Sequence, residues 1–257
     1  MAKLAPSVQP GRFDAEGYFV ARGMVDAERC GRLRAAALNA LGALQGPAEF
    51  EADVGYPGAP KSRAAEGGET PRRLLHAYSR DTVFREWGID PGIRERLTEI
   101  TGASQIWMSQ CHHNCVMTKH PGYSSRTDWH QDVRYWSFDR PELVSTWLAL
   151  GSERRDNGAL LVMPGSHTLE LDRGRLDQHL FLRPELEVNR ELIESAVTVE
   201  LEPGDVLFFH CRLFHAAGMN RSDVVKLSVV HTYHCDDNRP IPGTRSAQYP
   251  SVLLERE

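Results

Sequence analysis

The stretch Trp129-His130-Gln131-Asp132-Val133 carries a histidine and a carboxylate two positions apart among bulky apolar residues. In a β-strand, side chains two residues apart point to the same face, so His130 and Asp132 are expected to converge on one point while Gln131 faces away. A histidine from a distant strand would complete a 2-His-1-carboxylate set, which holds non-haem Fe(II) with open positions. Alone this pattern is a weak signal, because a half-buried strand whose polar side chains bond one another explains it as well.

Two later histidines, His210 and His215, compete for the third position. On one continuous strand they would point to opposite faces, so only one of them can face the same interior point. His215 precedes Ala216-Ala217-Gly218, where small residues allow backbone and a cosubstrate to approach closely. His210 follows an apolar run and is equally explained as a packed strand residue, so His215 is the preferred ligand.

Lys226 lies among valines and leucines beyond a turn at residues 220–223. A lysine there is costly to bury without an anionic partner, and a dicarboxylate cosubstrate would supply one. The turn predicts a hairpin in which the strand of Lys226 runs beside the strand that ends near His215. The alternative is that Lys226 lies on the exposed face of an edge strand.

From Ser104 onward the sequence reads as short strands separated by turn signals such as Asn157-Gly158 and Pro203-Gly204-Asp205. This texture is typical of a β-sandwich or barrel. The expected strands cover residues 106–108, 115–117, 129–136, 143–150, 159–163, 196–201, 206–209 and 224–233. Residues 169–195 interrupt them and are expected to form an inserted loop with a helical turn.

The N-terminal part has helical signals instead. A turn at residues 14–17 and a short strand at 18–20 precede a helix capped by Asp26, and two short helices follow, starting after Asp81 and at Asp90-Pro91. Residues 45–71 are rich in Gly and Pro, which predicts either a lid over a pocket or a disordered segment. We expect a single domain with a helical layer at 1–103, a β core at 104–235 and a tail at 236–257.

Composition excludes several classes of protein. The chain has 257 residues, 41% of them hydrophobic and 25% charged, as is ordinary for a globular protein. A net charge of −5 without a basic run argues against a nucleic-acid-binding surface, and no apolar stretch is long enough to span a membrane. The N-terminus lacks the apolar segment of a signal peptide, and the five cysteines are scattered, so we expect reduced thiols in the cytoplasm.

Cys111-His112-His113-Asn114-Cys115 superficially resembles a zinc site. No second Cys/His pair follows at zinc-finger spacing, and adjacent histidines on a strand point in opposite directions. A structural zinc is therefore disfavoured. Gly-rich phosphate loops and the nucleophile elbow of the hydrolases are also missing from the sequence.

Taken together, the ordered motifs resemble the phytanoyl-CoA dioxygenase family. They are His130-Gln131-Asp132, then Asn157-Gly158-Ala159-Leu160-Leu161-Val162-Met163-Pro164-Gly165-Ser166-His167, then Pro203-Gly204-Asp205, then His215 with Asn220 and Ser222. The opening Phe13-Asp14-Ala15-Glu16-Gly17-Tyr18 is similar to that of the family as well. The resemblance covers most of the chain and is far more specific than the His-x-Asp pattern alone.

Membership would imply a double-stranded β-helix, a cupin-like jelly roll, that uses Fe(II), 2-oxoglutarate and O2. By position, the resemblance implies His130, Asp132 and His215 as iron ligands and Trp147, Gln131 and Cys115 as residues of the 2-oxoglutarate pocket. Lys226 stands where the family usually has an arginine that binds the distal carboxylate of 2-oxoglutarate. Lysine keeps the charge but lacks the bidentate fork of arginine. Ala217 likewise replaces a frequent serine near that carboxylate.

The sequence thus leads to the hypothesis of an Fe(II)/2-oxoglutarate-dependent oxygenase that acts on a small molecule. Asp132 favours hydroxylation, because relatives that halogenate have a small residue there; desaturation or ring closure would use the same iron. Arg126, Arg134 and Tyr135 are candidate substrate contacts. One alternative is a cupin-type metal isomerase or a cofactor-independent dioxygenase. Another is a binding protein without catalysis, and a monomer is slightly favoured over an oligomer.

Overall fold

The computed structural model describes residues 10–256 and places two antiparallel sheets face to face. The larger sheet has the order β1-β9-β6-β11-β4-β3-β2, with β12 added beside β4, and the smaller has the order β5-β10-β7-β8. The strands of the larger sheet are β1 (Tyr18–Ala21), β9 (Val206–His210), β6 (Val144–Ala149), β11 (Lys226–Cys235), β4 (Ile106–Lys119), β3 (Pro71–Leu75), β2 (Ala48–Phe50) and β12 (Val252–Leu253). Those of the smaller sheet are β5 (Thr127–His130), β10 (His215–Ala217), β7 (Leu160–Val162) and β8 (Val197–Thr198). The expected jelly roll with flanking helices is confirmed.

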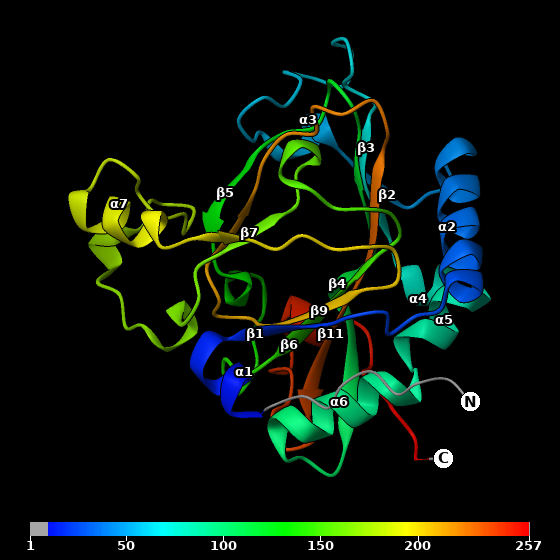
Figure 1. Cartoon of the computed structure of the whole chain (residues 1–257), viewed down its shortest axis with the longest axis vertical. Coiled ribbons are helices and arrows are strands. Elements are labelled where there is room, and N and C mark those ends of the chain that lie inside the picture. The colour runs from blue at the N-terminus through cyan, green and yellow to red at the C-terminus, as the bar shows by residue number, and fades with distance from the viewer. Residues whose placement is uncertain (1–9, 257) are drawn as a thin grey trace.

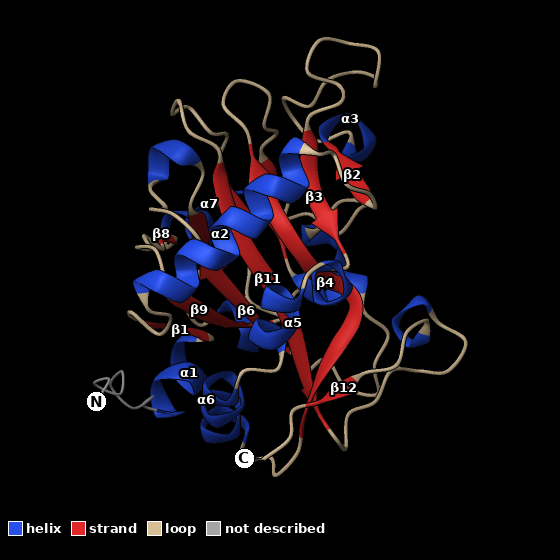
Figure 2. Cartoon of the chain, turned by 90° about the vertical axis from the view of Figure 1, so that its right-hand side faces the viewer, coloured by secondary structure: helices blue, strands red, loops and turns tan. Residues whose placement is uncertain are grey.

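Helices cover the outer face of the larger sheet, as Figure 1 and Figure 2 show for α2 and α5. The helices are α1 (Pro10–Glu16), α2 (Ala27–Gly42), α3 (Glu51–Val54), α4 (Ala77–Arg80), α5 (Thr82–Gly88), α6 (Pro91–Thr101) and α7 (Glu187–Glu194). Leu33 of α2 and Phe84 of α5 pack in one apolar cluster with Phe208 of β9. The predicted helix caps are confirmed, since the side chains of Asp26 and Asp90 each accept a backbone N–H of the helix that follows.

A second apolar cluster lies between the two sheets. Trp147, Phe209 and Val230 from the larger sheet meet Leu160 and Val162 from the smaller one. Alternate residues of each strand reach this interior, as the pleat of a sandwich requires. The space between the sheets is therefore where residues from distant parts of the chain can converge.

The structure differs from the expected elements in several places. Residues 10–16 form helix α1 instead of a turn, and the 45–71 segment includes β2 and α3. The two strands expected at 106–108 and 115–117 are one long strand, β4, with an irregular register opposite residues 231 and 232 of β11. The strand expected at 129–136 ends at His130, and a 3-10 helix covers Asp132–Tyr135.

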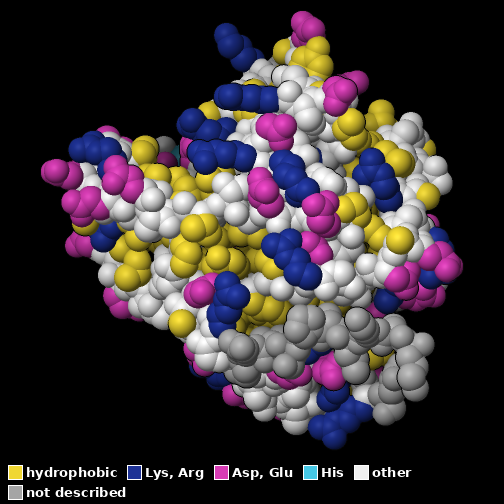
Figure 3. Space-filling model, viewed as in Figure 1, with side chains coloured by type: hydrophobic (Ala, Val, Ile, Leu, Met, Phe, Trp, Pro, Cys, Tyr) yellow, Lys and Arg dark blue, Asp and Glu magenta, His cyan; other side chains and the backbone are white. Residues whose placement is uncertain are grey.

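Strands from the N-terminal part also complete the larger sheet. Tyr18 of β1 pairs with Phe209 of β9, and Arg73 of β3 pairs with Met117 of β4. Every helix within residues 10–256 is too short or too polar to cross a bilayer. On the face in Figure 3, basic and acidic side chains are interspersed and do not gather into one charged patch.

Candidate active site

His130, Asp132 and His215 converge between the sheets. Their ligand atoms all lie within 4.8 Å of one another, and all three residues are buried. His130 ends β5 and His215 begins β10, and the two residues are direct cross-strand partners in the smaller sheet. Asp132 follows in the 3-10 helix, so it reaches the cluster through a sharp turn of the backbone and not through the strand geometry expected from the sequence.

Hydrogen bonds fix which ring nitrogen of each histidine faces the cluster. The Nδ1 of His130 lies 2.8 Å from the carbonyl oxygen of Asp128, and the Nδ1 of His215 lies 3.0 Å from that of Leu213. Because a carbonyl only accepts, each Nδ1 must carry the proton, and each Nε2 presents a lone pair. Both Nε2 atoms lie 3.5 Å from Oδ1 of Asp132.

Oδ1 of Asp132 is buried without a hydrogen-bond partner among the described residues. A buried carboxylate oxygen that faces two imidazole lone pairs is unsatisfied unless a cation lies between them. These two nitrogens and one oxygen are the donor set that suits Fe(II) with open positions. The residues present therefore fit a resident divalent iron.

At neutral pH the electrostatics of His130 and Asp132 are compatible with metal binding, whereas at His215 a metal competes with a proton. Burial lowers the pKa of His130 to about 4, so its imidazole is neutral at pH 7. Burial also opposes ionisation of Asp132, yet the neighbouring His113 and His215 hold the pKa of that carboxyl well below its usual range. Burial would lower the pKa of His215, but the Asp132 carboxylate more than offsets it and the pKa is raised.

His113 is a neighbour of the cluster that the sequence did not single out as part of the site. Its Nδ1 lies 3.4 Å from Oδ2 of Asp132, whereas His130 and His215 approach the other carboxylate oxygen, Oδ1. Burial lowers the pKa of His113 to about 3, so this ring is neutral. Its Nδ1 makes no hydrogen bond within residues 10–256, but at this distance the neutral ring is close enough to orient the carboxylate.

A cavity extends from the cluster into the space between the sheets. Lys226, Trp147 and Arg73 line it from the larger sheet, while His130 and His215 line it from the smaller one. Lys226 thus faces the same space as the histidines, but not through the expected hairpin: β11 pairs with β4 and β6, and β10 pairs with β5 and β7.

Lys226 is buried and has a carboxylate partner within the chain. Its Nζ lies 2.9 Å from Oε2 of Glu153, and the two side chains are only 4% and 1% exposed. Oε1 of Glu153 accepts from Trp147 Nε1 at 2.9 Å and from Ser228 Oγ at 2.6 Å. An external dicarboxylate is therefore not needed to explain the burial of this lysine, contrary to the argument from sequence.

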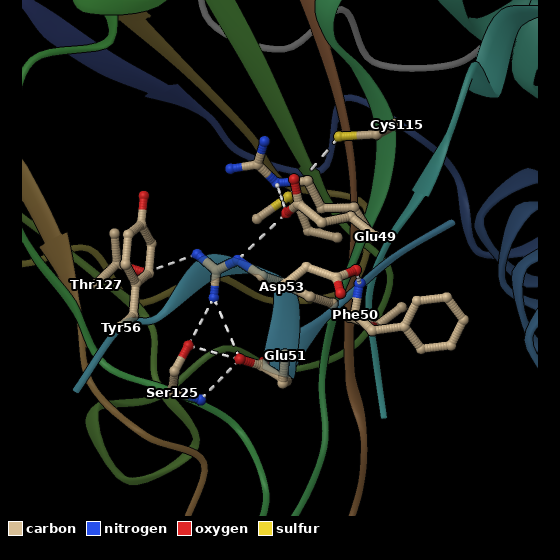
Figure 4. A network of polar contacts seen from close by, with 12 residues as sticks. Glu49, Phe50, Glu51, Asp53, Tyr56, Cys115, Ser125 and Thr127 are labelled. Carbon is tan, nitrogen blue, oxygen red and sulfur yellow. Dashed lines mark hydrogen bonds and ion pairs between the residues drawn. The ribbon is translucent and has the colours of Figure 1, made fainter. Parts of the chain in front are cut away.

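Three further cations lie at the cavity and were not predicted as site residues. Arg72, Arg73 and Lys119 all line it, and all three are largely buried. Arg72 donates to Ser125 Oγ and to Thr127 Oγ1, both at 2.9 Å, and pairs with Glu51 at 3.5 Å. Figure 4 shows Glu51, Ser125 and Thr127 brought together from separate segments.

Arg73 is less fully paired. Its Nε lies 3.4 Å from Oε1 of Glu49 and has no hydrogen bond among the described residues. The Nε of Arg72 also lacks a hydrogen bond, but Arg72 donates through both terminal nitrogens, whereas Arg73 makes no side-chain hydrogen bond within residues 10–256 and so keeps more donor capacity for the cavity.

Aromatic side chains from two inserted segments meet beside the iron ligands. Tyr56 of the 45–71 segment stacks edge-on against Phe181 of the 169–195 segment, and Phe181 lies 5.7 Å from the His130 ring. The hydroxyl of Tyr56 lies 3.4 Å from that of Tyr135. The guanidinium of Arg134 lies 4.2 Å from the centre of the Phe181 ring.

The remaining predicted site residues lie next to the cavity without lining it. Gln131 donates through its side chain to the carbonyl of Arg212, and the buried Cys115 contacts the sulfur of Met117. His210 ends β9 and contacts His167 at a different cavity. Among residues 10–256, His130, Asp132 and His215 are the only group of three candidate ligands close enough to hold a metal, so the 111–115 motif provides none.

Comparison with known proteins decides the family. Residues 13–227 match the phytanoyl-CoA dioxygenase (PhyH) family. The chain belongs to this family. A similar protein is a probable phytanoyl-CoA dioxygenase of Caenorhabditis elegans, 28% identical over 182 residues, which are 66% of this chain and 56% of that protein. The chain spans about half the length of the curated relatives that it matches.

Solved structures with the same fold include two that contain iron. EctD from S. alaskensis with bound Fe superposes with a TM-score of 0.72 at 19% identity, covering 94% of this chain and 84% of that chain. The epimerase SnoN in complex with Fe3+, alpha ketoglutarate and nogalamycin RO gives a TM-score of 0.71 at 20% identity, covering 91% and 89%. At this level of identity, the likeness shows that this member of the phytanoyl-CoA dioxygenase family shares its fold with both proteins.

Proposed function

We propose that this chain is an Fe(II)- and 2-oxoglutarate-dependent oxygenase that hydroxylates an unactivated C–H bond of a small molecule. The observation that carries the proposal is the cluster of His130, Asp132 and His215, with both Nε2 lone pairs turned toward one buried, unsatisfied carboxylate oxygen. When bound there, Fe(II) with 2-oxoglutarate and O2 supplies the oxidising power for hydroxylation, with release of succinate and CO2.

The chain's own part in this chemistry is to hold, orient and shield. The Asp128 and Leu213 carbonyls lock the two imidazoles in the tautomer that leaves Nε2 free. Apolar side chains such as Phe209, Leu160 and Val230 line the cavity and limit the access of water. Arg73, Trp147 and Lys226 line the part of the cavity where we place the cosubstrate.

The outer part of the cavity is where we place the substrate. Tyr56 and Phe181 come from the two irregular insertions and meet beside His130, so substrate selection is assigned to these segments. We also propose a cytoplasmic, monomeric enzyme without nucleic-acid or membrane partners. All five cysteines are free thiols, which supports a reducing compartment.

One observation favours a second candidate, a metal-binding jelly roll that does not use 2-oxoglutarate. The ammonium of Lys226 already has a carboxylate partner in Glu153, so it does not require the distal carboxylate of a cosubstrate. Both candidates predict metal binding at the same three residues, and they differ in whether a 2-oxo acid binds to the metal-loaded protein.

Anaerobic titration separates the two candidates. The protein is loaded with Fe(II), 2-oxoglutarate is added, and the visible charge-transfer absorbance of chelated iron is recorded. A saturable band that is lost in His130→Ala and kept in the control His210→Gln supports the oxygenase. Bound iron without any band refutes it and favours the second candidate.

A further inference from the structure

A phenylalanine is held beside the iron ligands by its neighbours in the chain. Phe181 donates its backbone N–H to the Asp177 carboxylate at 2.9 Å and accepts the backbone N–H of Asp177 at 2.8 Å. The next residue, Leu182, is buried and donates its N–H at 2.8 Å to a carbonyl of β5, the strand that ends at His130. The preceding residue, Leu180, has a φ of +62°, which is a strained conformation for leucine. The backbone is therefore strained at the point where it presents the Phe181 ring to His130.

The 3-10 helix that follows His130 places two more side chains near this ring. Residues three apart in a 3-10 helix lie on the same side, so Tyr135 lies on the side of the iron ligand Asp132. The guanidinium of Arg134 lies over both aromatic rings, 4.2 Å from the centre of Phe181 and 5.2 Å from that of Tyr135. An arginine is thus enclosed by aromatic side chains close to the iron ligands.

The charge of Arg134 has no partner in the described part of the chain. Its Nη1 is buried without a hydrogen bond, and no carboxylate of residues 10–256 lies within ion-pair distance of the guanidinium. Arg126, the other arginine that the sequence suggested as a substrate contact, is paired with Asp128 at 2.7 Å and is 58% exposed. A buried donor without an acceptor is costly, above all on a charged group, so a ligand that supplies the acceptor is favoured at Arg134.

This arginine lies outside the part of the cavity assigned to the cosubstrate. Neither Arg134 nor Phe181 lines the cavity that Lys226 lines. The Phe181 and Tyr135 rings nevertheless lie only 5.7 and 6.1 Å from the ring of His130. A molecule bound at Arg134 can therefore extend along these rings to the iron ligands without displacing the cosubstrate.

We propose that Arg134 binds a carboxylate of the substrate, and that the substrate is a small organic acid whose apolar body lies against Phe181 and Tyr135. The inference rests on the proposed function and deepens it, because it names the substrate class. The two rings cover the guanidinium carbon, so the N–H bonds in the plane of the group remain for a ligand. A carboxylate matches this planar fork in a bidentate way, and the rings favour an apolar skeleton beside it.

Two ligands of similar shape test the proposal. 4-Fluorobenzoate and 4-fluorobenzamide share an aromatic body and differ in charge. Each is titrated into the anaerobic protein loaded with Fe(II), and saturating 2-oxoglutarate is present so that the probe does not occupy the cosubstrate site. The dissociation constant is read from the broadening of the fluorine NMR signal. The variant is Arg134→Met, and Arg12→Met, which removes a 60% exposed side chain of α1, is the matched control for loss of one arginine.

We expect the acid to bind the wild-type protein with a dissociation constant of about 1 mM or below, as a small fragment can reach. The amide should bind at least about tenfold more weakly. Arg134→Met should raise the constant of the acid by about 10- to 100-fold, as for loss of a hydrogen bond between charged groups, and that of the amide by less than about threefold. Arg12→Met should change neither constant. Arg134→Gln serves if the methionine variant does not fold, and it should show the same acid-selective loss.

Three results would overturn the proposal: no binding of the acid to the wild-type protein at about 20 mM, equal binding of acid and amide, or unchanged binding of the acid in the Arg134 variants. Absence of the charge-transfer band when 2-oxoglutarate is added to the same sample would instead contradict the proposed function. The absorbance reports on iron and cosubstrate and the fluorine signal on the probe, so the two failures are distinguishable.

Discussion

Removal of one partner of the buried Lys226–Glu153 pair should destabilise the fold much more than removal of both charges. The Nζ–Oε2 distance is 2.9 Å, and both side chains are almost fully excluded from solvent. Loss of one partner from such a pair costs about 3–5 kcal/mol, mostly because the other charge remains buried without compensation. In Lys226→Met the charge left behind is the Glu153 carboxylate.

This loss of free energy of unfolding can be converted into a change in melting temperature, Tm. For a domain of roughly this size, each kcal/mol shifts Tm by about 2–4 °C, so Lys226→Met should lower Tm by roughly 6–20 °C. In the double variant Lys226→Met/Glu153→Gln neither charge of this pair remains, and the glutamine oxygen can still accept from Trp147 and Ser228. The double variant should regain at least half of the loss.

Thermal unfolding followed by circular dichroism measures the Tm values of Lys226→Met, Glu153→Gln and the double variant. A chelator is present so that bound metal does not contribute. Arg183→Met breaks an ion pair with Glu185 whose partners are 40% and 59% exposed, and as a control it should leave Tm nearly unchanged. If the double variant loses the full sum of the Lys226→Met and Glu153→Gln effects, the two groups are not coupled and the reasoning is refuted.

Three further outcomes follow from the site and its surroundings. Burial, with Arg72 and Lys226 nearby, lowers the pKa of Lys119 to about 7, so the unfolded chain binds this proton more tightly than the folded chain. The free energy of unfolding of the metal-free protein should therefore rise from pH 7 to 10. Lys119→Met should flatten that rise in urea unfolding, and an unchanged slope would contradict the lowered pKa of Lys119. His113→Phe removes the imidazole nitrogen that lies 3.4 Å from Asp132 and should weaken Fe(II) binding about 10- to 100-fold, measured in competition with a chelator. Wild-type affinity in this variant would exclude an orienting role for His113. Gly204→Ala would place a Cβ 2.2 Å from the Val25 carbonyl oxygen at a φ of +89°, so its Tm should fall clearly, and a wild-type Tm would show that the turn can shift.

Local signals in the sequence predicted α2, α5, α6 and most strands, because these signals depend on neighbouring residues. Asp26 and Asp90 cap the helices that follow them, and Gly102 ends α6 with a left-handed conformation. The resemblance to the family supplied the jelly roll, which local signals could only narrow to a sandwich or barrel. The structure of the 45–71 segment was harder to predict, because β2 is stabilised by pairing with β3, and the glycine and proline content of the segment does not reveal this contact.

The cluster of His130, Asp132 and His215 was predicted from the sequence as a set, but Glu153 was not predicted. Glu153 stands in the charged stretch Ser152-Glu153-Arg154-Arg155-Asp156, which has the composition of an exposed loop. An isolated bridge between Glu153 and Leu201 fixes this backbone, and the Glu153 side chain is fully buried. Lys119 was missed for a similar reason, because its importance depends on which residue of β11 lies opposite.

The pairing of β1 with β9 and of β4 with β11 has a consequence for the time course of folding. The first strand of the larger sheet finds its partner only near residue 206, and β4, which pairs with the earlier β3 on one side, gains its neighbour β11 only from residue 226 onward. A nascent chain on the ribosome therefore leaves β1 unpaired and one edge of β4 open until β9 and β11 have been synthesised. Because His215 lies in the same later part of the chain, all three ligands can capture iron only after residue 215 has been synthesised and β10 has paired with β5.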